Sequence, residues 1–362
     1  MPQPSGTVWR SQPRTLLKHQ IYRWYLDCWM GKICQRFPEA VVVDAFAGPG
    51  FYEDGPEGSP VVIADSFIGH ARRPDFNLLR LICAEARADR RDSLAERLAR
   101  LPRVPALHIQ EPTLGALPGC FPALSAAAHG RDSGTPVLWI LDPFDYSSVP
   151  FSLVSSCLRG PRDEVLITWF ADEIYRFVSD RAKEQAIDAH FGTGSWREAR
   201  SVMGEAARKE HLLKTYQQSL QAISGVQTGA FSIASKNESA RYSLVLATHS
   251  DAGLQCFNQA KWRMDKHRGH HVSEKRGLNQ PSLFDEMPEL SPLRKWLEGQ
   301  AGRALSFGQL AVQAGRLGFK ETHLRDTLTG MSADGLAVRE SPLDYTSSPW
   351  PPDSVIRFYA PP

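Results

Sequence analysis

The chain has 362 residues, of which 42% are hydrophobic and 23% are charged, with a formal net charge of +2 at pH 7. This composition is typical of a globular protein, excludes a disordered chain, and carries too little basic surplus to identify a nucleic-acid-binding protein by itself. No stretch reaches the ~20 apolar residues of a membrane span, and the first residues lack the apolar core of a signal peptide. We therefore expect a cytoplasmic protein without membrane contact.

The first half of the chain alternates helical and strand-like segments. Residues 15–37 place apolar side chains every three or four positions, which predicts an amphipathic helix that ends before Pro38. Short apolar runs follow at 41–46, 78–85, 106–110, 136–142 and 163–170. Such runs, separated by helical segments, are typical of parallel strands that are buried on both faces. The sequence therefore predicts a doubly wound, Rossmann-like α/β fold.

The second half predicts an insertion, a linker and a further domain. Helical patterns fill about 172–225, and the strand-like stretch 241–250 is expected to rejoin the same sheet, which closes a first domain over 1–265. Residues 266–289 are polar and interrupted by Gly and Pro, which indicates a linker. Three short helical patterns and two strand-like runs within 290–362 then predict a winged helix-turn-helix domain.

The cysteines show no metal or redox motif, because no two of them have the C-x₂-C spacing. We expect reduced thiols and no metal site. The residues are Cys28, Cys34, Cys83, Cys120, Cys157 and Cys256.

A loop with several glycines follows Asp44 at the end of the first predicted strand. Ligands of open parallel sheets bind beyond the carboxyl ends of the strands, where glycines let the backbone approach them. A simple turn explains this loop equally well on its own. Glu85, at the end of the next strand, favours a ligand site because its carboxylate can accept hydrogen bonds from both hydroxyls of a ribose. The interval between these acids exceeds the roughly 20 residues of the dinucleotide motif, which disfavours a nicotinamide cofactor.

A second acid, Asp142, ends another apolar strand and is followed by Pro143 and Phe144. An Asp-Pro turn is the simpler interpretation. At the ligand edge of the sheet, however, the carboxylate can accept a hydrogen bond from an amine while the aromatic ring stacks on a planar base. Holding such a nitrogen in line with a reactive methyl group supplies up to ~7–11 kcal/mol. The alternative interpretation is therefore a catalytic corner.

Together these motifs resemble the three-Cys-motif partner protein (TcmP) family over nearly all of the chain. The matching stretches are LLKHQIYRWYLDCW (16–29), DAFAGPGFYEDGPEGSP (44–60), LDPFDYS (141–147) and YSLVLATHSDAGLQCFNQAKW (242–262). The resemblance implies an S-adenosyl-L-methionine-dependent methyltransferase, often with a winged-helix domain, that acts with a separate protein carrying a three-cysteine motif. LLKH is also similar to an N-terminal element of bacterial ribosomal RNA adenine-N6 methyltransferases. That similarity nominates Lys18 and His19 as cofactor contacts, with a solvated helix face as the equal alternative.

The resemblance assigns expected roles residue by residue. Asp44 would face the methionine end of the cofactor, and Glu85 would hold the ribose. The loop beneath the cofactor would be Ala47, Gly48, Pro49 and Gly50. Glu111, with Gln110 as an equal alternative, would contact the adenine edge. The catalytic corner would be Asp142, Pro143 and Phe144, although Asp145 stands where the family more often has glycine, and the nucleobase tetrapeptide with two prolines and a tyrosine is matched only in part.

The sequence thus predicts N-methylation of a nucleobase amine in RNA or DNA. The alternatives are a methyltransferase for a small molecule or peptide, and a non-catalytic winged-helix adaptor. The basic stretch 261–276 is either a phosphate contact or a solvated linker. Residues Gln280 to Phe284 (QPSLF) resemble the peptide by which bacterial proteins bind the sliding clamp, a five-residue match that also arises by chance.

Overall fold

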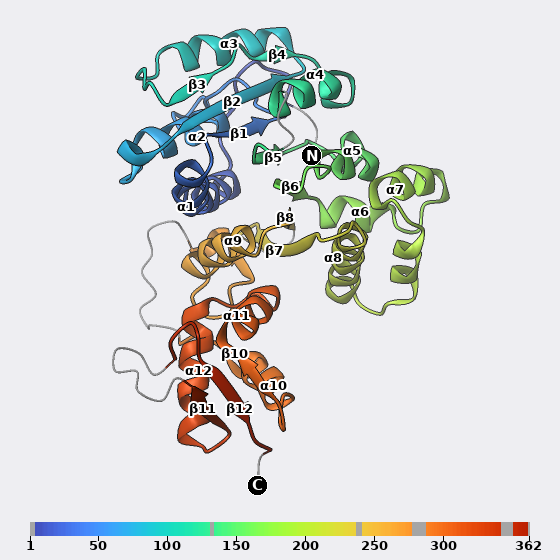
Figure 1. The fold of residues 1–362 in the computed structure, drawn as a ribbon. Coiled ribbons are helices and arrows are strands. Elements are labelled where there is room, and N and C mark those ends of the chain that lie inside the picture. Colours follow the sequence, from blue (N-terminus) through green and yellow to red (C-terminus); the bar gives the residue numbers. More distant parts are fainter. Residues whose placement is uncertain (1–3, 131–133, 237–240, 277–286, 342–349, 361–362) are drawn as a thin grey trace.

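The computed structural model describes residues 4–130, 134–236, 241–276, 287–341 and 350–360 (Figure 1). In this part of the chain a nine-stranded sheet forms the centre of the larger unit, and three helices with a small sheet form the C-terminal unit. Figure 1 shows the two units one above the other, with α9 (Asp251–Met264) of the larger unit facing the smaller one. The predicted clamp-binding peptide, 280–284, lies outside the described residues.

The central sheet is mainly parallel. Its order is β3-β2-β1-β5-β6-β8-β7-β9, and β4 pairs with β2. β8 runs antiparallel to both of its neighbours, whereas the other pairs are parallel. The strands are β1 (Glu39–Asp44), β2 (Leu78–Glu85), β3 (Leu107–Ile109), β4 (Thr113–Leu114), β5 (Val137–Leu141), β6 (Asp163–Trp169), β7 (Gln227–Ala234), β8 (Arg241–Thr248) and β9 (His271–Ser273). From β1 the chain runs outward to β2 and β3, and then returns to β5 on the other side. The direction of connection therefore reverses between β1 and β5.

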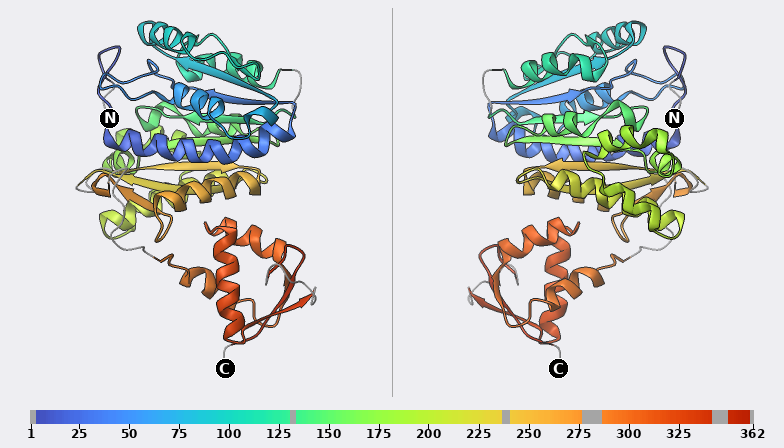
Figure 2. Two further views of the ribbon diagram at one scale, coloured as in Figure 1. Left: turned by 90° about the vertical axis from the view of Figure 1, so that its left-hand side faces the viewer. Right: turned by 90° about the vertical axis from the view of Figure 1, so that its right-hand side faces the viewer.

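Helices cover both faces of this sheet, as the opposite views of Figure 2 show. One core contains side chains of α1 (Pro13–Arg36), α2 (Ser59–Ile68), α3 (Ala88–Ala99) and α9. The other contains side chains of α4 (Leu117–His129), α5 (Phe151–Cys157), α6 (Ala171–Phe177), α7 (Glu184–Phe191) and α8 (Glu205–Gln221). Successive residues of β1 alternate between the cores, since Val42 enters the first and Val41 and Val43 enter the second. The predicted doubly wound α/β fold is therefore present, and the helices expected as an insertion form part of the second layer.

The C-terminal unit contains α10 (Ser291–Glu298), α11 (Phe307–Arg316) and α12 (Glu321–Ala333). Its sheet has the order β10-β12-β11, with β10 (Ala304–Ser306), β11 (Ala337–Ser341) and β12 (Val355–Phe358). β10 adds one strand to the two expected from the sequence. The winged-helix assignment itself stays a prediction. The C-terminal unit packs against α9, because Trp262 of α9 belongs to the hydrophobic core of this unit.

Two features differ from the sequence-based expectations. A disulfide joins Cys28 of α1 to Cys256 of α9, so the prediction that all cysteines are reduced thiols is wrong for this pair. The two helices lie side by side on the same face of the sheet, which brings together cysteines 228 residues apart. In addition, part of the expected linker is ordered, since residues His271–Ser273 form β9 against β7. Among the described helices, none is both long and apolar enough to cross a bilayer.

Candidate functional site

A cavity of about 250 Å³ lies at the carboxyl ends of β1 and β5. This is the point where the chain reverses its direction of connection, and it is the expected ligand position in a doubly wound sheet. Asp44 pairs with Ile140 in the β1–β5 register, so the next residues of both strands reach the same edge. The walls come from α1, the loop after β1, the turn after β5 and the start of β8.

The loop after β1 is tied to both neighbouring strands. The N–H of Ala45 donates to Ile140 O of β5 at 3.1 Å, and the N–H of Ala47 donates to Ala84 O of β2 at 3.0 Å. Gly48 has φ 63°, a left-handed backbone conformation that residues other than glycine rarely adopt. Ala47, Gly48, Pro49 and Gly50 all line the cavity. The structure therefore places the expected cradle residues along one wall.

The GPEGSP segment closes this loop on itself. Gly58 N–H donates to Gly50 O at 2.8 Å, and a bridge joins Phe51 to Glu57. A Cβ at Gly58 would lie 2.8 Å from the Gly50 carbonyl carbon, so only glycine fits this crossing. The chain leaves the cavity after Tyr52 and returns to it at Gly58, and α2 begins at the next residue.

Asp44 is fully buried beneath this loop and is not among the residues that line the cavity. Its Oδ1 accepts the N–H of Phe46 at 3.2 Å, whereas its Oδ2 is buried without a hydrogen-bond partner among the described residues. Burial raises the pKa of Asp44 to about 6, while the nearby Ser59 hydroxyl and the Phe46 N–H act in the opposite direction. An unsatisfied carboxylate oxygen is costly in a protein interior, because the water it loses is not replaced. A ligand with a positive charge or an N–H donor would satisfy this oxygen if the glycine loop above it moved to admit the ligand.

Asp142 is held by two side chains from different elements. Its Oδ2 forms an ion pair with Lys18 Nζ of α1, and its Oδ1 accepts the Thr168 hydroxyl of β6 at 2.5 Å. Burial alone raises the pKa of Asp142, but Lys18 and Thr168 outweigh it, so the pKa lies below its ordinary value. Asp142 is therefore an ionised acceptor at neutral pH.

His19 lies beside this pair but does not line the cavity. It is buried between the rings of Tyr22 and Tyr52, with centroids at 5.9 and 6.1 Å. Burial lowers the pKa of His19 to about 3, with a further contribution from Lys18. A neutral imidazole in an aromatic setting packs as part of the core, so the structure places Lys18 in the cavity wall and His19 behind it.

Phe144 and Pro143 line the cavity opposite the glycine loop. The ring of Trp9 meets Phe144 edge-on at a centroid distance of 6.1 Å, and the Arg90 guanidinium lies over Trp9 at 4.6 Å. Arg90 also donates to the Pro4 and Gly6 carbonyls, which holds the N-terminal segment in place. Because Pro4 and Trp9 are wall residues, this segment covers part of the cavity.

Glu85 and Glu111, like Asp44 and His19, are not among the residues that line the cavity. Glu85 is buried, and its two carboxylate oxygens accept the N–H groups of Gly48 at 3.0 Å and Arg87 at 2.9 Å. Glu85 thus supports the glycine loop from below. The Glu111 side chain is 76% exposed and faces Arg91, with 3.6 Å between charged atoms. Neither Glu111 nor Gln110 is brought to this site.

Asp145, the residue where the family more often has glycine, points away from the corner. Its Oδ1 accepts the N–H groups of Ser147 and Ser148, both at 2.9 Å, and thereby caps a short 3₁₀ turn. The Asp145 carboxylate therefore stabilises the turn that follows Phe144.

Sequence reasoning missed several wall residues: Trp9, Gln12, Thr15, Tyr52, Thr168, Phe170 and Tyr242. Thr168 had the clearest signal, because a polar residue near the carboxyl end of an apolar strand stands where ligands bind. Trp9 and Tyr242 carry no comparable pattern. Within the described residues no group of three His, Cys, Asp or Glu side chains is arranged to hold a metal ion.

No family model matches the chain, and no curated protein matches it. Among solved structures, Trm1 from Pyrococcus horikoshii, in complex with S-adenosyl-L-methionine, aligns over 70% of this chain with 12% identity and a TM-score of 0.39. The alignment spans only 61% of the Trm1 chain. An O-methyltransferase from Bacillus cereus, in complex with SAH, aligns over 64% of this chain and 80% of its own, with 12% identity and a TM-score of 0.36.

TomG, an O-methyltransferase from Streptomyces achromogenes solved with SAM, aligns over 67% of this chain and 91% of its own, with 14% identity and a TM-score of 0.34. Because these TM-scores lie below 0.5, we infer the function from the site itself and from the sequence resemblance.

Proposed function

We propose that this protein is an S-adenosyl-L-methionine-dependent methyltransferase that N-methylates a nucleobase amine in RNA or DNA. The observation that carries the proposal is the buried Asp44 carboxylate, whose Oδ2 lacks a partner among the described residues beneath a glycine loop. The cationic amino group of the cofactor's methionine part would supply that partner. Pairing would also favour the charged form of Asp44, which burial disfavours.

The remaining wall fits the same end of the cofactor. Gly58 and Ser59 bring the N-terminus of α2 to the cavity, where backbone N–H groups and the helix dipole favour a carboxylate. Glu85 lies under the loop with one hydrogen bond to each oxygen, and each oxygen can accept another. The cavity of about 250 Å³ is smaller than the ~300–1,000 Å³ of usual ligand pockets. Binding the whole cofactor would therefore move the covering segment that contains Pro4 and Trp9.

S-adenosyl-L-methionine supplies an electrophilic methyl group on a positively charged sulfur. In our proposal, Asp142 accepts a hydrogen bond from the amine that receives this methyl group. Lys18 and Thr168 each donate one hydrogen bond, to different oxygens of this carboxylate. Because a carboxylate can accept about four hydrogen bonds, Asp142 can still accept one from the amine. Phe144 would hold the base by its ring face, and this positioning supplies the proximity term.

A base inside a duplex would have to be flipped out, so single strands are the simpler substrate. By family resemblance, a separate three-cysteine-motif protein would act with this chain, and the C-terminal unit would position substrate or partner. A cytoplasmic location and contact with the sliding clamp through residues 280–284 remain further parts of this proposal.

Two measurements test the proposal. Isothermal titration with S-adenosyl-L-methionine should show binding to the wild type, while Glu53→Gln, on the exposed part of the same loop, should bind equally well. Absence of binding to the wild type would refute the cofactor assignment. Incubation with a labelled methyl donor and separate nucleic-acid, protein and metabolite fractions then identifies the acceptor. Label in nucleic acid supports the nucleobase, and label confined to metabolites or protein replaces it with the corresponding acceptor.

A further inference from the structure

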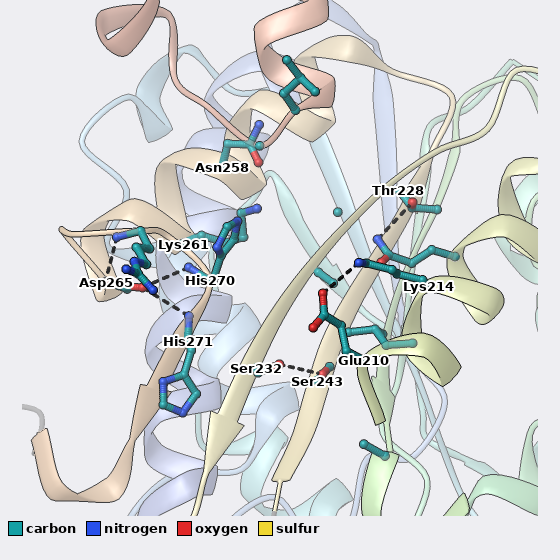
Figure 3. A pocket seen from close by; sticks show the side chains of 18 of the residues that line it. Glu210, Lys214, Thr228, Ser232, Ser243, Asn258, Lys261, Asp265, His270 and His271 are labelled. Atoms are coloured by element: carbon teal, nitrogen blue, oxygen red, sulfur yellow. Dashed lines mark hydrogen bonds and ion pairs between the residues drawn. The ribbon is translucent and has the colours of Figure 1, made fainter. Parts of the chain in front are cut away.

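A second and larger cavity, of about 790 Å³, lies at the junction of the two units (Figure 3). It is bounded by α8, α9, the β7–β8 pair, the turn before β9, and residues 315–318 at the end of α11 and just after it. Its volume is in the range of small-molecule sites. It shares no lining residue with the cavity that contains the glycine loop.

The lining of this junction cavity is strongly basic. Six Lys and Arg side chains line it against two acids, Glu210 and Asp265, and three histidines add further N–H groups. The six are Lys209, Lys214, Arg241, Lys261, Arg268 and Arg316. Lys209, Lys214 and Arg316 form ion pairs with nearby acids, whereas Lys261 and Arg268 form none among the described residues. These two cations favour an anionic ligand, because a concave surface of one sign concentrates the opposite charge.

Lys261 is the central observation. Lys261 is only 3% exposed, and its ammonium makes no hydrogen bond or ion pair with any residue in the described ranges, while the centroid of the Phe257 ring lies 5.7 Å from Nζ. Burial lowers the pKa of Lys261 to about 8. Buried ammonium groups are normally paired, since an isolated charge loses its hydration without compensation. Lys261 lines a cavity large enough for a ligand, so the missing anion has room beside it.

The acids of the cavity are engaged elsewhere. Asp265 accepts the backbone N–H groups of the turn that follows it, at 3.2 Å from His267 and 3.0 Å from His270. Glu210 pairs with Lys214 at 2.8 Å on the exposed side of α8. Figure 3 shows Lys261 beside Asp265 and His270, with the Glu210–Lys214 pair on the opposite wall. Neither acid neutralises Lys261.

A neighbouring side chain adds a hydrogen-bond acceptor. Asn258 lies one turn before Lys261 on α9, and its Nδ2 donates to Gly315 O at 2.7 Å, while its Oδ1 is buried without a partner in the described part of the chain. On neighbouring positions of β7 and β8, the hydroxyls of Ser232 and Ser243 lie 3.0 Å apart. The cavity thus combines one buried cation, a basic rim and groups that suit sugar hydroxyls.

We propose that the junction cavity binds a phosphate-bearing ligand, with Lys261 contacting the phosphate. The exposed cations Arg268 and Arg316 would surround the remaining negative charge. No Phe, Tyr or Trp occurs among the lining residues that the structure describes, so the three histidines offer the only side-chain rings there against which a base could stack. The ligand would be held by phosphate and sugar, independently of the proposed methyl transfer.

The test compares the full chain with two variants that each remove one positive charge. Lys261→Met removes the buried charge, and Lys266→Met removes an exposed charge from the adjacent turn, outside the cavity. The probes are AMP, UMP, ribose 5-phosphate and a single-stranded RNA of about 12 nucleotides, in isothermal titrations at about 50 mM salt. We expect the affinities for AMP and UMP to lie within about twofold of each other, because the proposed contacts involve the phosphate and the sugar and not the base. Lys261→Met should weaken binding at least about tenfold, the range of a lost charged hydrogen bond, and Lys266→Met should change it less than about twofold.

Binding of AMP and RNA with similar affinity would identify a metabolite phosphate, and much tighter RNA binding, lost in Lys261→Met, would identify a nucleic-acid backbone. The proposal is overturned if no probe binds the wild type with a Kd below about 1 mM, or if Lys261→Met binds the probes with the same Kd as the wild type. Lys261→Met should melt at the same or a higher temperature than the wild type, because it removes an unpaired buried charge. Arg268→Ala, at the exposed rim, gives a second variant that should weaken binding severalfold without disturbing the fold.

Discussion

The substitution Asp44→Asn should stabilise the fold at neutral pH and abolish tight cofactor binding. The wild-type carboxylate is fully buried, with one oxygen unpartnered among the described residues, and its pKa is raised to about 6 from 3.8. Between these two pKa values the folded state retains a proton that the unfolded state has lost. Stability therefore falls as pH rises through this range, and stays low above it.

The magnitude follows from the pKa shift. A difference of about two pKa units corresponds to about 3 kcal/mol at high pH. Between about pH 4.5 and about pH 8, the linkage relation gives a loss of about 2 kcal/mol in the wild type that the Asp44→Asn variant would not show. The amide keeps the oxygen that accepts the Phe46 N–H, but its NH₂ group takes the unpartnered position and costs about 1–2 kcal/mol. We therefore expect a net gain of about 1–2 kcal/mol near pH 8 and none near pH 4.5.

Urea denaturation of both proteins across this pH range measures the effect, because contributions from other titrating groups cancel in the difference. Isothermal titration with S-adenosyl-L-methionine should show a loss of about ten- to hundredfold, the range of a charge-assisted hydrogen bond. A stability difference that does not change with pH would refute the raised pKa of Asp44. Unchanged cofactor affinity would refute its contact with the amino group.

Three further changes test other parts of the structure. Lys18→Met should lower the free energy of unfolding by about 1–3 kcal/mol, because it leaves the partly buried Asp142 carboxylate without its cation, and should reduce methyl transfer at least about tenfold. Gly58→Ala should weaken cofactor binding, since its Cβ would collide with backbone across the closed loop, as titration can measure. Reducing the Cys28–Cys256 disulfide should lower the melting temperature, with a loop-entropy limit of about 5 kcal/mol.

Each of these changes has a matched comparison. Lys32→Met removes an exposed lysine from the same helix as Lys18 and should leave stability within about 0.5 kcal/mol of the wild type. Gly119→Ala, in α4 with open space around its Cβ position, should not affect cofactor binding. Alkylation of the denatured, unreduced chain should label the four free cysteines, and labelling of all six would contradict the disulfide.

The sequence predicted the centre of the sheet well and its edge poorly. β1, β2, β5 and β6 are buried on both faces and therefore appear as continuous apolar runs. β7 was not predicted, because it lies toward the edge, where Gln227, Thr228 and Gly229 break the apolar pattern. β9 falls in a polar stretch, and only its pairing with β7 makes it a strand.

The candidate site shows the same division. Asp44 and Asp142 follow apolar runs, and the order of the strands places both at one edge, so the sequence could indicate their proximity. The pairing of Asp142 with Lys18, 124 residues earlier, depends on how α1 crosses the sheet, and no local pattern encodes it. Glu111 lies away from the cavity because it stands between β3, which ends at Ile109, and β4, which pairs again with β2, and its side chain is 76% exposed. The disulfide could not be predicted for the same reason as the ion pair, because its two cysteines meet only through the packing of α1 against α9.

The packing of α9 has a practical consequence for dissecting the protein into pieces. A cut in the polar stretch after residue 265 would follow the composition of the chain, but it would remove the surface on which α9 rests. Trp262, whose indole donates to Gly318 O at 2.8 Å, would be exposed, and Asn258 would lose Gly315. A shortened chain of this kind should aggregate or bind hydrophobic dyes, because it exposes the apolar surface of α9 that the C-terminal unit covers in the full chain. Protein engineers should therefore keep α9 and the C-terminal unit together, or replace Trp262 with a polar residue when they separate them.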